Sequence, residues 1–386
     1  MQLNLKITGN YKMMTKIPMV DLVGQYQQIK EEINISINEV LESAHFIKGP
    51  KVAQFEKDLG AYLKIDHVIS CANGTDALQI ALMALELKEG DEVIVPSFTY
   101  VATAEVIALL KLTPVMVEVD PDTFNTTAEI IKKAITKKTK VIVPVHLFGQ
   151  CSDMEDIMTL AAEKGIYVIE DNAQAIGADY TFKNGQTKKS GTIGHIGCTS
   201  FFPSKNLGCY GDGGAIYTND DALGEKIRMI ANHGQKKKYH HSIIGVNSRL
   251  DAIQAAVLNV KLKYLNKYSE ARRKIAERYD RALGDIAELQ TPAYQHNSTH
   301  VFHQYTLQVK KGERDKLRDY LSSHNISSMI YYPVPLYRQE AFQEYFTAQH
   351  PVTERLCSSV LSLPIHTEMN DETQDSIIQA IKSYFE

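Results

Sequence analysis

A single lysine, Lys205, lies in an unusual stretch of the chain between Gly197 and Ala215. The stretch also holds three aromatic residues and several glycines, and glycine costs more backbone entropy in a helix or strand than other residues do. A lysine placed among hydroxyl and aromatic side chains is expected to be poorly solvated, which lowers the pKa of its amine and makes it a nucleophile. The stretch therefore predicts a catalytic amine, against the alternative of a solvated surface lysine.

Three other sites supply groups that such a lysine would need. Asn73–Asp76 follows a predicted strand and opens a predicted helix, so free amides and the helix dipole favour an anion there, although the same residues suit an ordinary helix start. Asp171 ends a buried apolar strand and needs a partner, which a pyridinium, a metal or an arginine would supply. Tyr100 follows another strand and offers a ring for stacking. Together these groups are the requirements of pyridoxal 5′-phosphate (PLP).

Short apolar runs alternate with amphipathic helices along the first part of the chain. This alternation predicts an α/β fold with a mostly parallel sheet covered on both faces, in which ligands bind at the carboxyl ends of the strands. The glycine-rich lysine stretch is expected to be neither an ordinary helix nor an ordinary strand. The predicted strands are 68–70, 92–96, 113–119, 141–146, 167–171 and 215–218, and the predicted helices are 25–41, 52–63, 77–87, 101–111, 127–134, 153–164 and 221–232.

A second structural unit is expected toward the C-terminus. A long helical region over 250–283 forms a bridge, and the pattern changes from about Glu288 onward to one predicted strand and two predicted helices. The length of 386 residues fits one large and one small domain. We predict an N-terminal extension over 1–16, a large cofactor-binding domain over 17–265 and a smaller C-terminal α/β domain over 266–386.

Composition and charge exclude several classes of function. A net charge of −4 with an ordinary share of charged residues provides no basic field for nucleic acid. The five cysteines include no CxxC pair, so neither a disulfide framework nor a zinc site is predicted. The N-terminus lacks the apolar core of a signal peptide, and no apolar run approaches the length of a membrane span. We therefore expect a cytoplasmic protein without nucleic-acid, membrane or metal partners.

Seven short motifs follow one another along the chain. They are Phe46–Gly49, Asn73–Ala77, Gly90–Pro96, Glu170–Gln174, Ser200–Lys205, Gly211–Gly214 and Asn247–Asp251. In this order they resemble the DegT-type sugar aminotransferases, a branch of the aspartate-aminotransferase-like PLP enzymes of fold type I. The resemblance extends from about Ile17 to the C-terminus. It implies a large domain with a mostly parallel, mixed sheet and a smaller C-terminal α/β domain.

The resemblance also implies roles for individual residues. Lys205 looks like the residue that binds PLP covalently, and Asp171 like the partner of the pyridine nitrogen. Tyr100 matches the aromatic residue stacked on the ring, and Gln174 a side chain near the ring hydroxyl. Asn247 matches a residue that the neighbouring subunit supplies to the phosphate, which implies an obligate homodimer with shared active sites. The phosphate site is further matched by Gly74, Thr75 and Ser200.

The implied reaction transfers the amino group of L-glutamate to a keto sugar linked to a nucleotide. The segments around Lys205 and Arg249 look most like enzymes that aminate C3 of UDP-2-acetamido-2-deoxy-3-keto-glucuronic acid for surface polysaccharides such as O-antigen. Arg249 is then a candidate for holding the sugar carboxylate, or alternatively a structural ion-pair residue near the dimer contact. Tyr331 and Tyr332 are candidate sugar contacts, although tyrosines stand at 331 and 337 where relatives often have histidine.

Four alternatives remain at this point. The same cofactor could serve dehydration, although the dehydratases of the family have histidine at the position of Lys205, or amination of another nucleotide keto-hexose at C3 or C4. A binding or regulatory protein could retain the fold. A nicotinamide dehydrogenase is disfavoured, because Gly211–Gly214 precedes a strand, which is the wrong context for a dinucleotide motif.

The lysine run 236–238 suits a solvated loop better than a phosphate site.

Overall fold

The computed structural model describes residues 16–386, so the predicted extension over 1–16 lies outside the described residues except for Lys16. Seven strands form the main sheet, and they are parallel to their neighbours except at the strand 214–218. From edge to edge they are β1 (His67–Cys71), β9 (Gly214–Thr218), β8 (Ile196–Ser200), β5 (Tyr167–Asp171), β4 (Thr139–Ile142), β2 (Glu92–Pro96) and β3 (Thr113–Val117). The predicted α/β fold with a mostly parallel, mixed sheet is confirmed.

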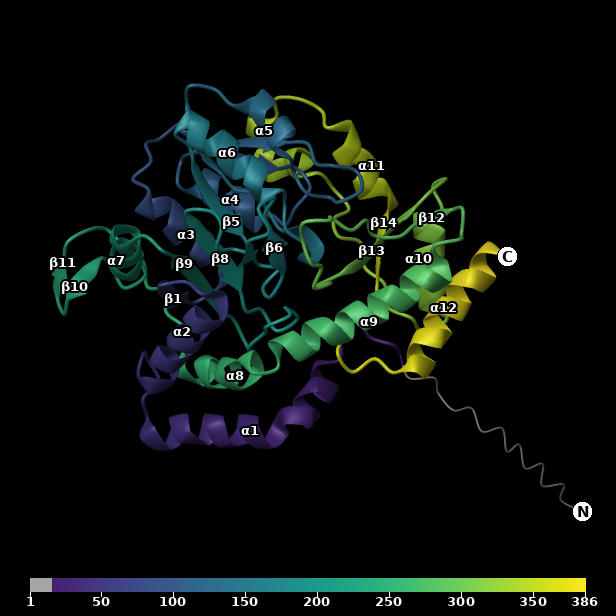
Figure 1. Ribbon diagram of the computed structural model, residues 1–386, viewed down its shortest axis with the longest axis horizontal. Coiled ribbons are helices and arrows are strands. Elements are labelled where there is room, and N and C mark those ends of the chain that lie inside the picture. Colours follow the sequence, from purple (N-terminus) through teal and green to yellow (C-terminus); the bar gives the residue numbers. More distant parts are fainter. Residues whose placement is uncertain (1–15) are drawn as a thin grey trace, which may run out of the picture.

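Helices cover both faces of this sheet, because its strands send alternate side chains into two apolar layers. In β2, Val93 and Val95 pack into one layer and Ile94 into the other. The first layer is covered by α3 (Gly74–Ala84), α4 (Ala102–Leu109) and α7 (Asp221–Ile230). The second is covered by α5 (Ala128–Ala134), α6 (Met154–Lys164), α2 (Pro50–Leu63) and α8 (Ala252–Leu262), and α1 (Leu22–Ser43) packs on α8 (Figure 1).

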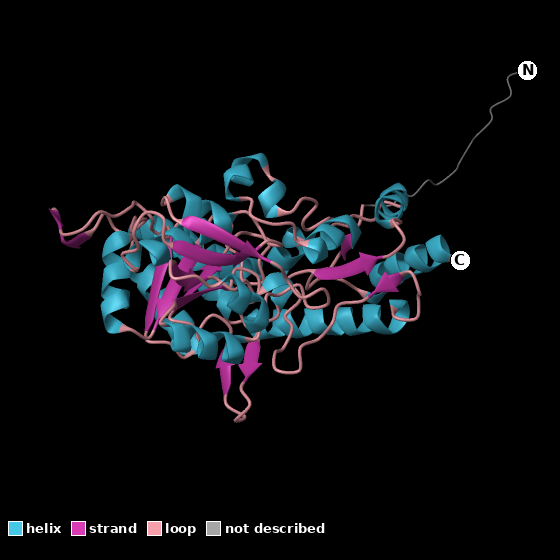
Figure 2. Ribbon diagram, turned by 90° about the horizontal axis from the view of Figure 1, so that it is seen from above, coloured by secondary structure: helices cyan, strands magenta, loops and turns pink. Residues whose placement is uncertain are grey.

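The C-terminal part of the chain builds a smaller antiparallel sheet from β12 (Leu289–Gln290), β13 (Tyr305–Val309) and β14 (Val360–Leu363). The helix α9 (Leu265–Leu283) runs from the main sheet toward it, and Figure 2 shows the two groups of strands one after the other along the long axis. Ile17 pairs with Ile326 of this smaller unit. The boundaries 17–265 and 266–386 stay predictions. The other helices here are α10 (Arg314–Ser323), α11 (Pro351–Ser359) and α12 (Asp371–Phe385).

The structure corrects the expectation that the start of the lysine stretch avoids a regular strand. Its first residues belong to β8, which was not predicted, and β8 pairs antiparallel with β9, which matches the predicted strand over 215–218. Glycine is required at Gly214 because a Cβ atom there would lie 2.4 Å from the carbonyl oxygen of Asn73, at the start of α3. The expected polar loop after Gly234 also contains a hairpin, β10 (Gln235–Lys237) and β11 (His240–His241), which projects beside α7 (Figure 1). Sequence patterns missed another hairpin, β6 (Asp179–Thr181) and β7 (Thr187–Lys189).

The cysteines, the possible metal ligands and the helices bear on three further features of the chain. All five cysteines are buried and carry free thiols. Over residues 16–386, no three or more His, Cys, Asp and Glu side chains gather as metal ligands would. In the same range, no helix combines the length and the apolar character that crossing a bilayer demands.

A buried hydrogen-bonded pair fixes the end of β5 next to the segment that follows β4. The Nε2 atom of His146 lies 2.7 Å from a carboxylate oxygen of Glu170, and both side chains are inaccessible to solvent. The backbone N–H of Ser152 donates to Nδ1 of His146, so Nε2 carries the hydrogen that faces Glu170. Three backbone N–H groups also donate to Glu170, from Gly191, Ile193 and Gly194. Because Glu170 precedes Asp171, this network holds the strand end that presents Asp171.

Replacing Glu170 by alanine is expected to destabilise the protein strongly. The change leaves the His146 N–H and three backbone N–H groups without acceptors in the interior, and each buried unsatisfied group costs about 1–3 kcal/mol. We expect a loss of at least about 3 kcal/mol in the free energy of unfolding, measured by urea denaturation. As a control, Glu225→Ala removes an exposed partner of Lys236 and is expected to change nothing measurable. Equal stability of Glu170→Ala and the wild type would contradict the network.

Candidate active site

The carboxyl ends of the parallel strands open into a cavity of about 650 Å³. Its walls come from the ends of β5 and β8, the start of α3 and the loop that carries Lys205, and residues 303–304 and 331–332 of the C-terminal part close it. All but two of the predicted site residues line this cavity. The predicted site residues that line the cavity are Gly74, Thr75, Tyr100, Asp171, Gln174, Ser200, Lys205, Tyr331 and Tyr332.

The start of α3 forms one wall of the cavity and presents free backbone donors. The side chain of Asn73 caps the helix by accepting from the backbone N–H of Asp76 at 2.8 Å. The N–H groups of Gly74 and Thr75 belong to the first turn and have no carbonyl partner within the helix. A Cβ atom on Gly74 would lie 2.6 Å from Cβ of Ser200, so only glycine lets this turn approach β8. The arrangement suits a phosphate dianion.

Asp171 brings a buried carboxylate to the cavity. Its side chain is 6% exposed, and it accepts hydrogen bonds from the hydroxyl of Thr103 at 2.7 Å and from the backbone N–H of Ala173 at 3.1 Å. Among the described residues, no lysine, arginine or histidine forms an ion pair with it. A carboxylate in this state is stabilised by a cation that enters the cavity, such as a protonated ring nitrogen.

Lys205 lies in a tight turn beside this carboxylate. The backbone N–H of Lys205 donates to the carbonyl oxygen of Phe202 at 2.8 Å, and the side chain lines the cavity. Burial lowers the pKa of the Lys205 amine to about 8, and the charge of Asp171 opposes this shift. A fraction of the amine is therefore neutral near pH 7, which a nucleophilic lysine requires.

Aromatic and amide groups surround the remaining wall. The side chain of Gln174 accepts from the backbone N–H of Phe148 at 2.8 Å and donates to the hydroxyl of Tyr332 at 3.1 Å. Burial raises the pKa of the Tyr332 hydroxyl above its usual range, so this group stays protonated. The ring of Tyr100 lies 6.2 Å from that of Tyr332 and is 56% exposed. One face of Tyr100 is thus available for stacking on a flat ligand.

Asn247 and Arg249 are absent from this cavity. Asn247 is exposed and pairs with Asn232. Arg249 lines a separate hollow of about 230 Å³ near the start of α2, together with Lys48. No ion pair involves Arg249 within residues 16–386. The structure of one chain therefore divides the predicted site residues between two surfaces.

Several residues that line the cavity or bond to its groups were missed by sequence reasoning. Thr103, which bonds Asp171, lies one turn after Tyr100 at the start of α4, and a hydroxyl in that first turn was the signal available. His303 has no local signal, because it is 98 positions from Lys205 in the chain. Burial lowers the pKa of His303 well below its usual range, and Lys205 and Arg272 lower it further, so its imidazole is neutral. The other missed residues include Ser204, Asp212 and Gln304.

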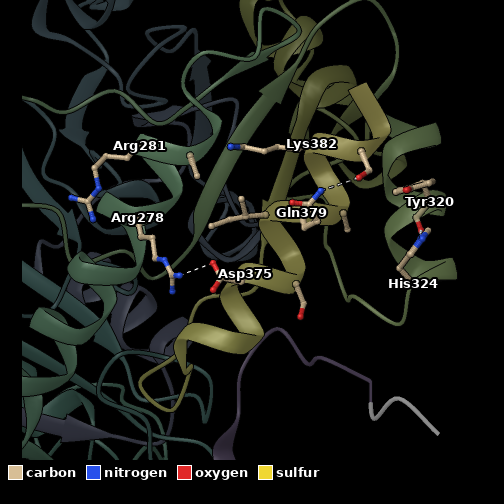
Figure 3. A pocket seen from close by; sticks show the side chains of 12 residues that line it. Arg278, Arg281, Tyr320, His324, Asp375, Gln379 and Lys382 are labelled. Carbon is tan, nitrogen blue, oxygen red and sulfur yellow. Dashed lines mark hydrogen bonds and ion pairs between the residues drawn. The ribbon is translucent and has the colours of Figure 1, made fainter. Parts of the chain in front are cut away.

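A larger hollow lies on the surface of the C-terminal part, between α9, α10 and α12 (Figure 3). Its volume is about 990 Å³, and it contains none of the predicted site residues. Its charged groups include Arg278, which is paired with Asp375 at 2.6 Å and with Asp371 at 2.8 Å. It lacks the combination of a desolvated amine and an unpaired carboxylate that marks the Lys205 cavity.

The fold and the cavity define a class of protein. A desolvated lysine, a buried carboxylate without a cationic partner, an anion site at a helix start and an exposed aromatic ring meet at the carboxyl edge of a mostly parallel sheet. These groups fit the aldehyde, the ring nitrogen, the phosphate and the ring face of PLP. The site is that of a PLP-dependent enzyme of fold type I.

Comparisons with known proteins identify the family. Residues 27–382 match the DegT/DnrJ/EryC1/StrS aminotransferase family, and the chain belongs to it. The chain is 46% identical to the pleiotropic regulatory protein of Geobacillus stearothermophilus, over 96% of this chain and 98% of that protein. It is 44% identical to the UDP-2-acetamido-2-deoxy-3-oxo-D-glucuronate aminotransferase of Pseudomonas aeruginosa, over 95% and 99%. The crystal structure of Streptomyces venezuelae DesV in complex with a ketimine intermediate superposes with a TM-score of 0.92 at 36% identity, covering 96% and 99%.

The lowered pKa of Lys205 predicts how PLP attachment depends on pH. Only the neutral amine attacks the aldehyde, and its fraction rises about tenfold between pH 7 and a plateau above pH 9 if the pKa is about 8. The rate of PLP attachment to cofactor-free protein, followed by visible absorbance, is expected to rise over this range with a midpoint near pH 8. Asp171→Asn removes a charge that raises the pKa of Lys205, so its midpoint is expected to fall. A midpoint near the ordinary value of 10.5 would contradict a desolvated lysine.

Proposed function

We propose that this aminotransferase carries the amino group of L-glutamate to C3 of UDP-2-acetamido-2-deoxy-3-keto-glucuronic acid. The observation that carries the transfer chemistry is the placement of Lys205 and Asp171 in one cavity. The 44% identity to the Pseudomonas enzyme named for this sugar supports the substrate. A 3-amino uronic acid of this kind suits a surface polysaccharide such as O-antigen, and we place the reaction in the cytoplasm.

Asp171 and Lys205 have different roles in the proposed reaction. When bound, PLP supplies an electron sink for the substrate carbon. Asp171 would pair with the ring nitrogen, and the hydroxyl of Thr103 and the N–H of Ala173 hold its carboxylate in place by hydrogen bonds. Lys205, whose amine is partly neutral near pH 7, removes and returns protons at the substrate carbon as base and acid.

The other residues of the cavity wall would bind and orient the cofactor and the sugar. The start of α3 with Gly74 and Thr75, and the hydroxyl of Ser200, hold the phosphate. Tyr100 would stack on the ring of PLP. Gln174 donates to the hydroxyl of the protonated Tyr332 and would also bind the ring hydroxyl, and Tyr331 and Tyr332 would contact the sugar.

We infer that two copies of the chain share their active sites. Asn247 and Arg249 lie outside the cavity of their own chain. The surface around them carries large apolar side chains, with Phe46 44% and Ile47 51% exposed, and Ile47 pairs directly with Asp251. An apolar patch of this kind favours a protein contact. In a symmetric dimer it would carry Asn247 to the phosphate and Arg249 to the sugar carboxylate of the other subunit.

The reaction is tested by incubating the purified protein with L-glutamate and the UDP-linked 3-keto uronate and determining the product by NMR. We expect a 3-amino sugar and 2-oxoglutarate, and no turnover by Lys205→Ala. The matching UDP-linked 3-keto-hexose, which lacks the carboxylate, is the comparison substrate. If Arg249 binds the carboxylate, Arg249→Met should raise KM for the uronate about tenfold or more and leave the hexose unaffected. Turnover by Lys205→Ala would contradict the mechanism, and equal KM changes would contradict the role of Arg249.

Shared active sites are tested by mixing two inactive variants. Lys205→Ala lacks the amine, and Asn247→Asp places a negative charge next to the phosphate. Each variant alone is expected to be inactive. Exchange of subunits yields mixed dimers in which one site is intact, so activity should return to about a quarter of the wild-type value. Native mass spectrometry measures the mixed dimers, and their presence without recovered activity would show that each chain builds its site alone.

A further inference from the structure

Lys261 is a buried lysine outside the cavity. It belongs to α8, its side chain is 1% exposed, and its ammonium donates to the carbonyl oxygen of Gly208 at 2.8 Å. The ammonium also lies 4.8 Å from the ring centre of Tyr210. No carboxylate within residues 16–386 forms an ion pair with it. Burial lowers the pKa of Lys261 to about 8. Burying an unpaired cation costs free energy, and a methionine would fill the same space without that cost. A lysine at this position therefore suggests a specific role.

The carbonyl of Gly208, which accepts the hydrogen bond from Lys261, belongs to the loop that carries Lys205. Pro203 and Gly208 flank Lys205 on either side and pack against each other, since a Cβ atom on Gly208 would lie 2.4 Å from the carbonyl oxygen of Pro203. The N–H of Lys205 closes the turn on Phe202. The carbonyl of Gly208 is therefore at the base of the turn that aims Lys205 into the cavity, and the Lys261 ammonium fixes it.

A second side chain of α8 anchors the same loop. Gln254 lies seven residues before Lys261, which places both on one face of the helix. Its side-chain oxygen accepts from the backbone N–H of Tyr210 at 2.8 Å, and its amide donates to the Tyr210 carbonyl at 3.3 Å. Gln254 thus provides hydrogen-bond partners for the backbone N–H and carbonyl of Tyr210, and Lys261 provides a donor for the carbonyl of Gly208. The two contacts fix the loop after Lys205 on a rigid helix.

We propose that Lys261 is a positioning residue: by holding the Gly208 carbonyl it keeps the Lys205 turn closed and the Lys205 amine out of water. The inference rests on the proposed role of Lys205. Its consequence is specific, because the pKa of Lys205 depends first on burial. The charges of Asp171 and His303 couple to that of Lys205, and Tyr100, Asp212, Tyr331 and Tyr332 also line its cavity. Lys261 itself faces Cys209 and Tyr210. Opening the turn admits water to Lys205 and moves its pKa back toward the ordinary lysine value.

The test measures the titration of Lys205 in the full-length protein without PLP, by competitive labelling with acetic anhydride from pH 6 to 11 and mass spectrometry of the Lys205 peptide. In the wild type we expect a midpoint near pH 8. In Lys261→Met the midpoint is expected to rise by about one pH unit. Lys261→Gln is too short to reach Gly208 and is expected to shift in the same direction, which provides a second variant if Lys261→Met does not fold. Lys261→Arg keeps a cationic donor and is expected to restore the wild-type midpoint.

Arg314→Met is the matched control. Arg314 is a buried cation that, like Lys261, donates to backbone carbonyl oxygens, here those of Cys357 and Val360, and it also pairs with Asp315 at 2.9 Å. It lies in the C-terminal part, far from the loop in the chain. Its loss should lower stability without moving the Lys205 midpoint. An unchanged midpoint in folded Lys261→Met or Lys261→Gln would overturn the proposal, and so would a Lys261→Arg protein that behaves like Lys261→Met. This labelling needs no turnover, so its outcome is independent of the activity assays that test the proposed function.

Discussion

The structure depends on keeping two opposite charges poorly solvated at the carboxyl edge of one sheet. Asp171 is nearly inaccessible and has hydrogen bonds but no cationic partner in the described part of the chain, and Lys205 faces the same cavity with a lowered pKa. Burial disfavours the charged form of Lys205, and a buried carboxylate needs hydrogen bonds or a cationic partner. The surrounding protein must therefore hold the two side chains in place and leave between them the space that a cationic ring with an aldehyde would fill.

Several contacts around the cavity hold Asp171 and Lys205 in these positions. The buried pair of Glu170 and His146 fixes the strand residue next to Asp171. Close approaches that only glycine permits bring the start of α3 against β8 at Gly74 and against β9 at Gly214. The loop 201–213 between β8 and β9 is tightly packed, and α8 supports it from outside the cavity through Gln254 and Lys261. Rigid elements thus position each functional group, and the loops supply only the final turn.

The distribution of the family motifs over one chain has a consequence for assembly. The motifs that build the cavity lie on strand ends and at a helix start, where they meet within the chain. The Asn247–Asp251 motif and the Phe46–Gly49 motif instead lie next to each other through the pairing of Ile47 with Asp251, on a separate surface with exposed apolar side chains. In the dimer proposed above, the second surface would act on the cavity of the other copy.

The sequence by itself determined the fold class and the cofactor. It also singled out Asp171 and Tyr100, because each follows a predicted strand and such ends share one edge of a parallel sheet, and Lys205, because it lies among glycine, hydroxyl and aromatic residues. It missed β8, since the glycines argued against a strand that is stabilised by pairing with β5 and β9. Only the tertiary structure placed His303 beside Lys205, joined Gln174 to Tyr332 and Lys261 to Gly208, and put Arg249 on another surface. These contacts join residues 50 or more positions apart, where no local pattern records which side chains will meet.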